Sequence, residues 1–241
     1  MRISIVTMFP EMLDSLYQSP IVQHACQKGI LQLEVVDIKD YADGSFRHID
    51  DSPYGGGAGM IMRVEPVWNV LQKIQTGCSY TIIPTPIGYV YNQNKARQLA
   101  VKEHLIFICG HYEGIDERVY SFCDERISMG DYIMSGGEYA TMNIIDSIVR
   151  LLPGVIKKES TDDESFENGL LEYHQYTKPV SFNGLSVPDV LRSGNHEKIR
   201  KFRLKQSLVN TLTYRSDLME HHNLTDEEKE IIEAIQNKKN D

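Results

Sequence analysis

Short hydrophobic runs alternate, along the first two thirds of the chain, with segments in which apolar and polar residues follow a helical spacing. The runs Arg2–Phe9 and His104–Cys109 are rich in Ile, Val and Phe and stop at Pro or Gly, and Thr81–Pro84 is a shorter run of the same kind. Such runs are typical of strands buried in a parallel sheet. We therefore predict that these three segments are strands of one sheet.

Helical spacing fills segments between and after these strands. It covers Glu11–Lys28 and Glu65–Gln75, and the second segment opens with Glu-Pro, as helices often do. A longer helix is predicted over Glu138–Leu152, where Pro153-Gly154 would end it. Because strands and helices alternate, the pattern predicts an α/β fold, with a doubly wound parallel sheet flanked by helices as the simplest arrangement.

The pattern changes near residue 156. Residues 157–164 are charged and carry no large apolar side chain, which is typical of a linker. From Ser165 onward the spacing predicts a mostly helical unit, whose apolar positions include Ile199, Phe202, Leu204 and Leu208, then Ile231, Ile232 and Ile235. We therefore predict a larger domain over 1–156, a flexible linker over 157–164 and a smaller helical domain over 165–241.

Composition narrows the class of protein. The 241 residues are 41% hydrophobic and 24% charged, as in globular proteins with a substantial core. The apolar start is too short for a signal peptide, and no window reaches the roughly 18 apolar residues that a membrane span needs. The four cysteines form no Cys-x-x-Cys pair, which argues against a zinc site and a disulfide framework. We expect a soluble, cytoplasmic protein.

The charge is unevenly distributed. The formal net charge of −9 opposes phosphate binding by the protein as a whole. Between Arg192 and Lys205, however, there are six basic residues and a single acid, Glu197. Such a cluster is either a solvated helix face or a local surface for nucleic acid, and the cluster alone leaves both interpretations open.

Three glycine-containing segments are predicted to be turns that follow apolar strands: Pro84–Gly88, Cys109–Gly114 and Gly130–Gly137. Loops at the carboxyl ends of parallel strands are where open α/β sheets bind ligands. Each glycine taken alone is equally typical of a tight turn. Together, the three segments predict one shared pocket.

A fourth glycine cluster lies at Asp50–Gly59. It lacks the Lys-Ser/Thr end of a phosphate-binding P-loop, and the chain has no Gly-x-Gly-x-x-Gly that opens a helix after a strand. These absences argue against ATPases and dehydrogenases. The remaining use for such a loop is a close approach to a flat or anionic partner, which includes RNA.

Arg150, late on the predicted helix, and the acidic group Asp162, Asp163 and Glu164 form a candidate acid–base pair. A fixed cation near a movable carboxylate suits a reaction that removes a proton while negative charge develops on a neighbouring oxygen. The alternatives are a surface arginine at a helix end and a solvated acidic linker. The residues alone thus indicate an α/β ligand-binding protein with a tethered helical domain.

Longer strings of residues carry a resemblance to a known family. In chain order they are Ile5–Met12, Asp50–Met60, Cys109–Val119, Ser128–Glu138, Leu152–Val155, Glu164–Glu172, Gln175–Pro179 and Val187–Arg200. Together they span nearly the whole sequence, which resembles the bacterial tRNA (guanine-N1-)-methyltransferase family of the SPOUT class.

The resemblance implies a fold and a cofactor. The expected fold is α/β, with a SPOUT-type trefoil-knotted parallel sheet flanked by helices and a small, mostly helical C-terminal domain that binds tRNA. In this family the knot loops hold S-adenosylmethionine. The matching cofactor-binding positions here are Pro84, Thr85, Pro86, Gly88, Gly110, Tyr112, Glu113, Met129, Gly130, Asp131, Tyr132, Ile133, Met134, Gly136 and Gly137.

The resemblance also implies a reaction and partners. The family works as a homodimer with active sites at the subunit interface, and it methylates N1 of the guanine at position 37 of tRNA, next to the anticodon. By family position, Arg150 stabilises O6 of that guanine, and the residue before Ser165 removes the N1 proton. That residue is normally Asp; here it is Glu164, with Asp163 beside it.

Several alternatives stay open at this stage. Methyl transfer from a sulfonium needs no metal in principle. The family has nevertheless been linked to Mg²⁺, but the sequence shows no group of oxygen ligands that would place this ion. His111 stands where the family often has Arg. The rival functions are a related enzyme that acts on a ribose hydroxyl or on ribosomal RNA, and an RNA-binding module that holds S-adenosylmethionine without turnover.

Overall fold

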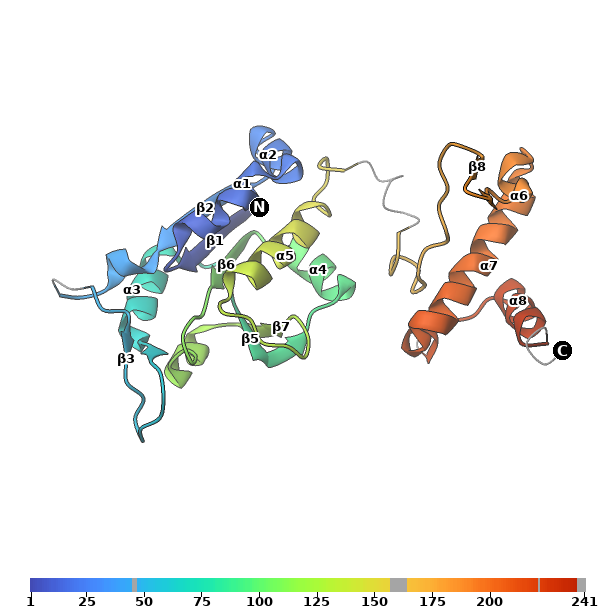
Figure 1. The fold of residues 1–241 in the computed structure, drawn as a ribbon. Helices are drawn as coiled ribbons and strands as arrows, with labels where there is room; N and C mark the ends of the chain where they lie inside the picture. The colour runs from blue at the N-terminus through green and yellow to red at the C-terminus, as the bar shows by residue number, and fades with distance from the viewer. Residues whose placement is uncertain (45–46, 157–163, 221, 238–241) are drawn as a thin grey trace. The chain divides into compact units, whose positions relative to one another are not determined.

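A parallel sheet of five strands lies at the centre of the first part of the chain, in a computed structural model that describes residues 1–44, 47–156, 164–220 and 222–237 (Figure 1). Its strand order is β2-β1-β6-β5-β7, and each neighbouring pair is parallel. The strands are β1 Arg2–Thr7, β2 Gln32–Asp37, β5 Ser79–Val90, β6 His104–Ile108 and β7 Glu125–Ser128. The chain divides into two compact units, Met1–Ile156 and Lys157–Asp241, which are described separately.

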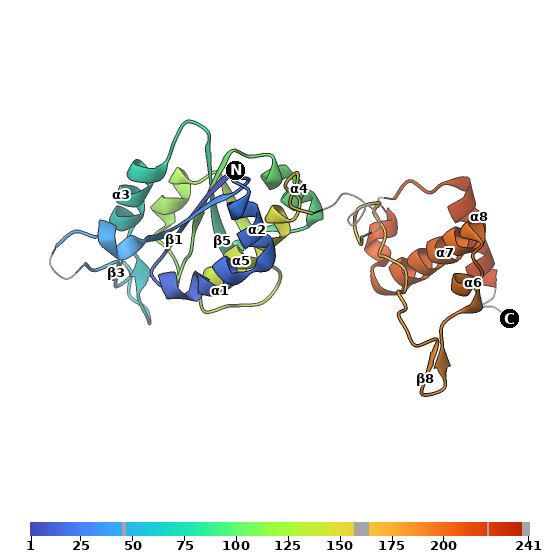
Figure 2. The same cartoon turned by 90° about the horizontal axis from the view of Figure 1, so that it is seen from above.

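Helices cover both faces of the sheet, as Figure 2 shows. One face carries η1 Pro10–Leu13, α1 Asp14–Gln18, α2 Pro20–Gln27, α4 Gln93–Ala100 and α5 Glu138–Val149. The other face carries η2 Ile38–Tyr41, α3 Val64–Ile74 and η3 Glu117–Phe122. The α/β class with a parallel sheet flanked by helices, predicted from the alternating pattern, is confirmed.

The place of β6 at the centre of the sheet explains why residues 105–108 form an unbroken apolar run. Leu105 and Phe107 pack into the core on one face, while Ile106 and Ile108 pack into the core on the other. All four are fully buried. A strand buried on both faces has no polar side to alternate with, so all four positions after His104 are hydrophobic.

The predicted strands are present, but two edge strands were not predicted. β2 and β7 lie at the two ends of the strand order, where one side of each strand has no neighbour in this sheet. Most of their residues are only partly buried, and β7 begins with Glu125 and Arg126. β7 has no continuous apolar run, and the sequence analysis overlooked the alternation of Leu33 and Val35 with Gln32 and Glu34 in β2.

Two predicted boundaries were wrong. Glu11–Lys28 is not one helix but is covered by η1, α1 and α2. Ser19 separates α1 from α2, because it takes an extended conformation (φ −60°, ψ 124°) before Pro20. Proline disfavours a helical residue before it. The segment Pro84–Gly88 is not a turn after a strand: it lies within β5, where Pro84 and Tyr89 both pair with Ile127 and the residues between them bulge out of register.

The second unit is mostly helical. It contains α6 Asp189–Arg192, α7 His196–Tyr214, η5 Ser216–Glu220 and α8 Asp226–Asn237, together with the hairpin strands β8 Ser181–Phe182 and β9 Leu185–Ser186. Leu208 and Thr211 of α7 are fully buried. The Thr211 hydroxyl accepts a hydrogen bond from the backbone N–H of Leu171 at 2.9 Å, which ties the start of the unit to its longest helix.

Candidate active site

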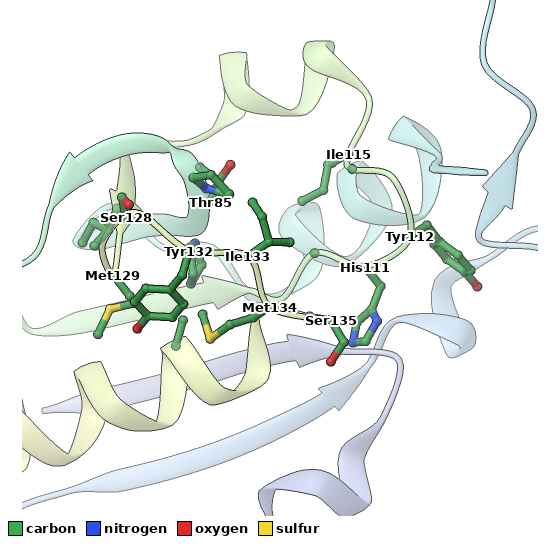
Figure 3. A pocket seen from close by; sticks show the side chains of 18 of the residues that line it. Thr85, His111, Tyr112, Ile115, Ser128, Met129, Tyr132, Ile133, Met134 and Ser135 are labelled. Carbon is green, nitrogen blue, oxygen red and sulfur yellow. The ribbon is translucent and has the colours of Figure 1, made fainter. Parts of the chain in front are cut away.

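A pocket of about 320 Å³ lies where β5, β6 and β7 end or bulge (Figure 3). Its lining includes Pro84–Pro86 from the β5 bulge, residues 110–115 after β6, and residues 127–130 and 132–137 at and after the end of β7. The three glycine-containing segments therefore meet at one place, the edge where open parallel sheets bind ligands. The volume is within the roughly 300–1,000 Å³ range of small-molecule sites.

Most of the predicted cofactor-binding positions line this pocket. Those that do are Pro84, Thr85, Pro86, Gly110, Tyr112, Glu113, Met129, Gly130, Tyr132, Ile133, Met134, Gly136 and Gly137. Gly88 and Asp131 are not among the lining residues. Gly88 instead packs on β7, where a Cβ atom would lie 2.7 Å from the backbone of Arg126 and Ile127. Its lack of a side chain lets the bulged part of β5 return to the sheet.

Gly137 joins two of the pocket segments. Its N–H donates to the carbonyl of Gly110 at 2.9 Å, and a Cβ atom would lie 2.9 Å from Cα of Cys109 and 3.0 Å from the Gly110 nitrogen. The φ of −81° is ordinary for any residue, so the glycine is needed for close approach rather than for its conformational freedom. The loop after β7 can therefore pack directly on the loop after β6.

The glycine-rich segment at 50–59 leads into a short strand that is hydrogen-bonded to a pocket loop. It connects the short strands β3 Asp50–Asp51 and β4 Ile61–Met62. Met62 donates from its N–H to the carbonyl of Gly114 at 3.0 Å, and Asp116 donates back to the carbonyl of Met62 at 3.0 Å. The sequence alone gave no indication that the strand after this segment pairs with residues 110–116.

Tyr112 takes a left-handed conformation, with φ 61°, at the rim of the pocket. Such a conformation is uncommon for a residue with a side chain and occurs at sites that the surrounding structure holds in place. Burial and the Asp50 carboxylate raise the pKa of the Tyr112 hydroxyl. Tyr112 is therefore a neutral, polar group at neutral pH, suited to hydrogen bonding.

A buried polar chain beneath the pocket was missed by the sequence analysis. The fully buried carboxylate of Glu138 contacts the hydroxyl of Thr7 at 2.6 Å and Nε2 of His111 at 2.8 Å. The neighbouring Cys109 thiol lies 3.4 Å from the Thr141 hydroxyl, and burial together with the Glu138 charge raises its pKa. The available signal was the acid that follows Gly136-Gly137, since a charged residue at the start of a buried helix needs partners.

The predicted catalytic residues lie in different parts of the chain. Arg150 follows the last residue of α5, is half-buried, and donates from its backbone N–H to the carbonyl of Asp146 at 3.3 Å. Glu164 is half-buried in the second unit, where its carbonyl accepts from the N–H of Glu167 at 3.2 Å. Asp163 and Asp162 lie outside the described residues. The pairing of Arg150 with a carboxylate stays a prediction.

The basic cluster lies mainly on α7, and acids partly neutralise it. Arg200 forms ion pairs with Glu197 at 2.9 Å and with Glu227 of α8 at 2.7 Å. The Arg203 guanidinium lies over the ring of Tyr173, with 4.5 Å to the ring centroid. Part of the cluster therefore holds the second unit together.

The described residues contain no group of three or more His, Cys, Asp or Glu side chains that could hold a metal ion. Within the same parts of the chain, no helix combines the length and the apolar character needed to cross a membrane.

The first unit is an α/β domain with a parallel sheet and, at the carboxyl ends of its strands, a pocket of the size that small-molecule sites have. Comparison with known proteins gives its family. The sequence profile described as "tRNA (Guanine-1)-methyltransferase TrmD" matches residues 1–221. The chain belongs to this family.

Curated relatives agree with this assignment. A tRNA (guanine-N(1)-)-methyltransferase of Carboxydothermus hydrogenoformans is 52% identical over 234 residues, which are 96% of this chain and 92% of the relative. A protein of the same description from Streptococcus pyogenes serotype M1 is 47% identical over 98% of this chain and 96% of its own length. Another from Clostridium botulinum is 47% identical over 99% of this chain and 100% of its own length.

Proposed function

We propose that this protein transfers a methyl group from S-adenosylmethionine to N1 of the guanine at position 37 of tRNA, next to the anticodon. The observation that carries the proposal is the pocket in which the β5 bulge and the loops after β6 and β7 meet, in a chain of the tRNA (guanine-1)-methyltransferase family. Most of the positions expected to hold the cofactor line that one pocket.

The lining of the pocket suits S-adenosylmethionine. Gly110, Gly136 and Gly137 let the loops that line the pocket pack closely on neighbouring residues. Ile133 and Met134 supply apolar surface for a flat base. Tyr112 and Glu113 add polar groups at the rim, and a carboxylate there would attract the cationic part of the ligand. When bound, S-adenosylmethionine supplies an electrophilic methyl group on a positively charged sulfur.

The remaining chemistry falls to this chain's own acids and bases. Guanine N1 carries a proton and is a poor nucleophile until the proton leaves, whereupon negative charge spreads onto O6. We assign proton removal to the carboxylate of Glu164 or of Asp163 and stabilisation of O6 to the Arg150 guanidinium. The N1–C bond then forms as the C–S bond breaks, its electron pair goes to sulfur, and the carboxylate keeps the proton.

We assign no residue to Mg²⁺, since the described residues contain no group of three or more His, Cys, Asp or Glu side chains that could hold the ion.

We also infer that the working enzyme is a homodimer with a trefoil-knotted catalytic unit, as its family membership implies. Apolar residues on the pocket loop support the dimer: Ile133 is 81% exposed and Tyr132 is 55% exposed in the single chain. Surface of this kind beside a ligand pocket is typical of an interaction site. For tRNA, the exposed Lys198 and Lys205 of α7 provide positive charge on an otherwise acidic protein.

Transfer of labelled methyl from S-adenosylmethionine to two tRNA transcripts tests the proposal. One transcript carries guanine at positions 36 and 37, and the other carries adenine at 37. We expect label in the first transcript and none above background in the second. Equal labelling of both transcripts would exclude position 37 as the target, and labelling of neither would exclude the transfer itself.

A further inference from the structure

The buried polar chain beneath the pocket joins three elements. Glu138 is the first residue of α5, Thr7 is the last residue of β1, and His111 lies in the loop after β6. The Thr7 hydroxyl donates to Oε1 of Glu138, and Nε2 of His111 contacts Oε2. A carboxylate only accepts hydrogen bonds, so Nε2 of His111 carries the proton. Each oxygen of the buried carboxylate therefore has one donor.

The ring of His111 is held on several sides. The ring of Phe9 meets it edge-on, with 4.8 Å between centroids and 66° between planes. Its backbone N–H lies 3.3 Å from the sulfur of Met62. The side chain itself is only 14% exposed. The imidazole is thus a fixed part of the pocket floor rather than a mobile surface group.

The loop after β7 passes directly over this pair. A Cβ atom at Gly136 would collide with the His111 ring and would lie 2.6 Å from Oε2 of Glu138. Both His111 and Gly136 line the pocket. The loop that shapes the pocket therefore packs directly on the His111–Glu138 contact.

We propose that His111 is a positioning residue for the cofactor: by donating to Glu138 it holds the Gly136-Gly137 end of the pocket loop in its binding shape. The inference rests on the proposed function, since the ligand is taken to be S-adenosylmethionine. Loss of the donor leaves a fully buried carboxylate short of a partner, which proteins avoid by moving backbone or admitting water. Either response displaces the loop over it.

Calorimetric binding of S-adenosylmethionine to the purified full-length enzyme tests this role. We expect His111→Ala to weaken binding by about tenfold or more, the effect of one lost partner to a buried charge. His111→Gln restores binding to within about threefold, because its terminal N–H₂ reaches where Nε2 lies, whereas the shorter His111→Asn behaves like alanine. His24→Ala, an exposed histidine on α2, serves as the matched control and leaves affinity unchanged.

Kinetics separate positioning from general stability. Because His111 acts through the loop, the KM for S-adenosylmethionine rises in His111→Ala while kcat at saturating cofactor stays within about twofold. The inference would be overturned if a folded His111→Ala protein bound S-adenosylmethionine with wild-type affinity, or if His111→Gln bound it as weakly as His111→Asn does. If the alanine variant does not fold, the comparison of the glutamine and asparagine variants provides the test. Wild-type enzyme that binds no S-adenosylmethionine would instead overturn the proposed function, and the inference with it.

Discussion

At Gly137 the chain lacks a side chain because two pocket loops meet there. A Cβ atom at Gly137 would lie 2.9 Å from Cα of Cys109 and 3.0 Å from the Gly110 nitrogen. Both are backbone atoms, which cannot rotate away. We predict that Gly137→Ala lowers the free energy of unfolding by about 1–3 kcal/mol, as overpacking does. Urea denaturation measures this. Gly77→Ala is the control, because nothing lies within 4 Å of a Cβ there, and equal losses in the two variants would contradict the packing argument.

His104 predicts a pH dependence of stability. It is 2% exposed and is hydrogen-bonded through its two ring nitrogens to Ser4 and Ser79. Burial lowers its pKa below the usual value, Arg2 lowers it further, and Glu34 opposes both. The unfolded chain therefore binds a proton more readily than the folded protein, so stability falls as the pH drops below about 6.5 and through the folded-state pKa.

Substitution isolates this contribution. We expect the loss of unfolding free energy between pH 7.5 and pH 5.5, measured in urea, to be smaller in His104→Gln than in wild type. His24→Gln, on the exposed side of α2, keeps the wild-type difference. An identical pH difference in His104→Gln and wild type would show that His104 does not titrate differently on folding.

At the scale of single residues, sequence reasoning located the pocket better than its chemistry. Gly110, Gly136 and Gly137 were picked out because glycine after a strand allows close backbone approach, and all three line the pocket. The contacts of Glu138 with Thr7 and His111 could not be predicted from the sequence, since the three residues are up to 131 positions apart in the chain. Only the fold brings them together.

Among the elements, the bulge in β5 has the most direct consequence for the pocket. It places Pro84, Thr85 and Pro86 in the lining, and it can form because Gly88 returns the chain against the β7 backbone. We predict that Gly88→Ala weakens S-adenosylmethionine binding at least about tenfold, equivalent to 1.4 kcal/mol. Equilibrium dialysis with labelled cofactor measures this, with Gly77→Ala as control. Wild-type affinity in Gly88→Ala would mean that the bulge does not shape the site.

The elements that could be predicted are those with a strong helical periodicity or a continuous apolar run. α3 and α5 begin within a residue of the expected positions, and β1 and β6 lie within the predicted runs. The bulge was mistaken for a turn because Pro84-Thr-Pro contains the residues that turns favour. The polar edge strand β7, which both holds this bulge and leads into a pocket loop, has no periodic signal at all.

For the whole molecule, the central prediction is that Arg150 and a carboxylate at Asp163 or Glu164 act on the same guanine base. Arg150 belongs to the first unit and Glu164 to the second. We expect Arg150→Ala to lower kcat for methyl transfer by about 100-fold or more, since it removes charge stabilisation. Combined Asp163→Asn and Glu164→Gln should lower kcat by about 10²–10⁴-fold, the usual contribution of a general base. Single-turnover assays with tRNA measure both rates.

The single substitutions then assign the base. If Glu164 acts alone, Glu164→Gln matches the double variant and Asp163→Asn matches wild type; the reverse result assigns the base to Asp163. Wild-type rates in the double variant would remove both carboxylates from the mechanism. Lys73→Ala, at an exposed position of α3, provides a charge-changing control that should retain full kcat.

The most direct measurement of the central claim is mass spectrometry of nuclease fragments from tRNA that has reacted with the enzyme and S-adenosylmethionine. The account predicts 1-methylguanosine as the methylated nucleoside, in the fragment that contains position 37. A 2′-O-methylated nucleoside, or 1-methylguanosine confined to another fragment, would contradict it.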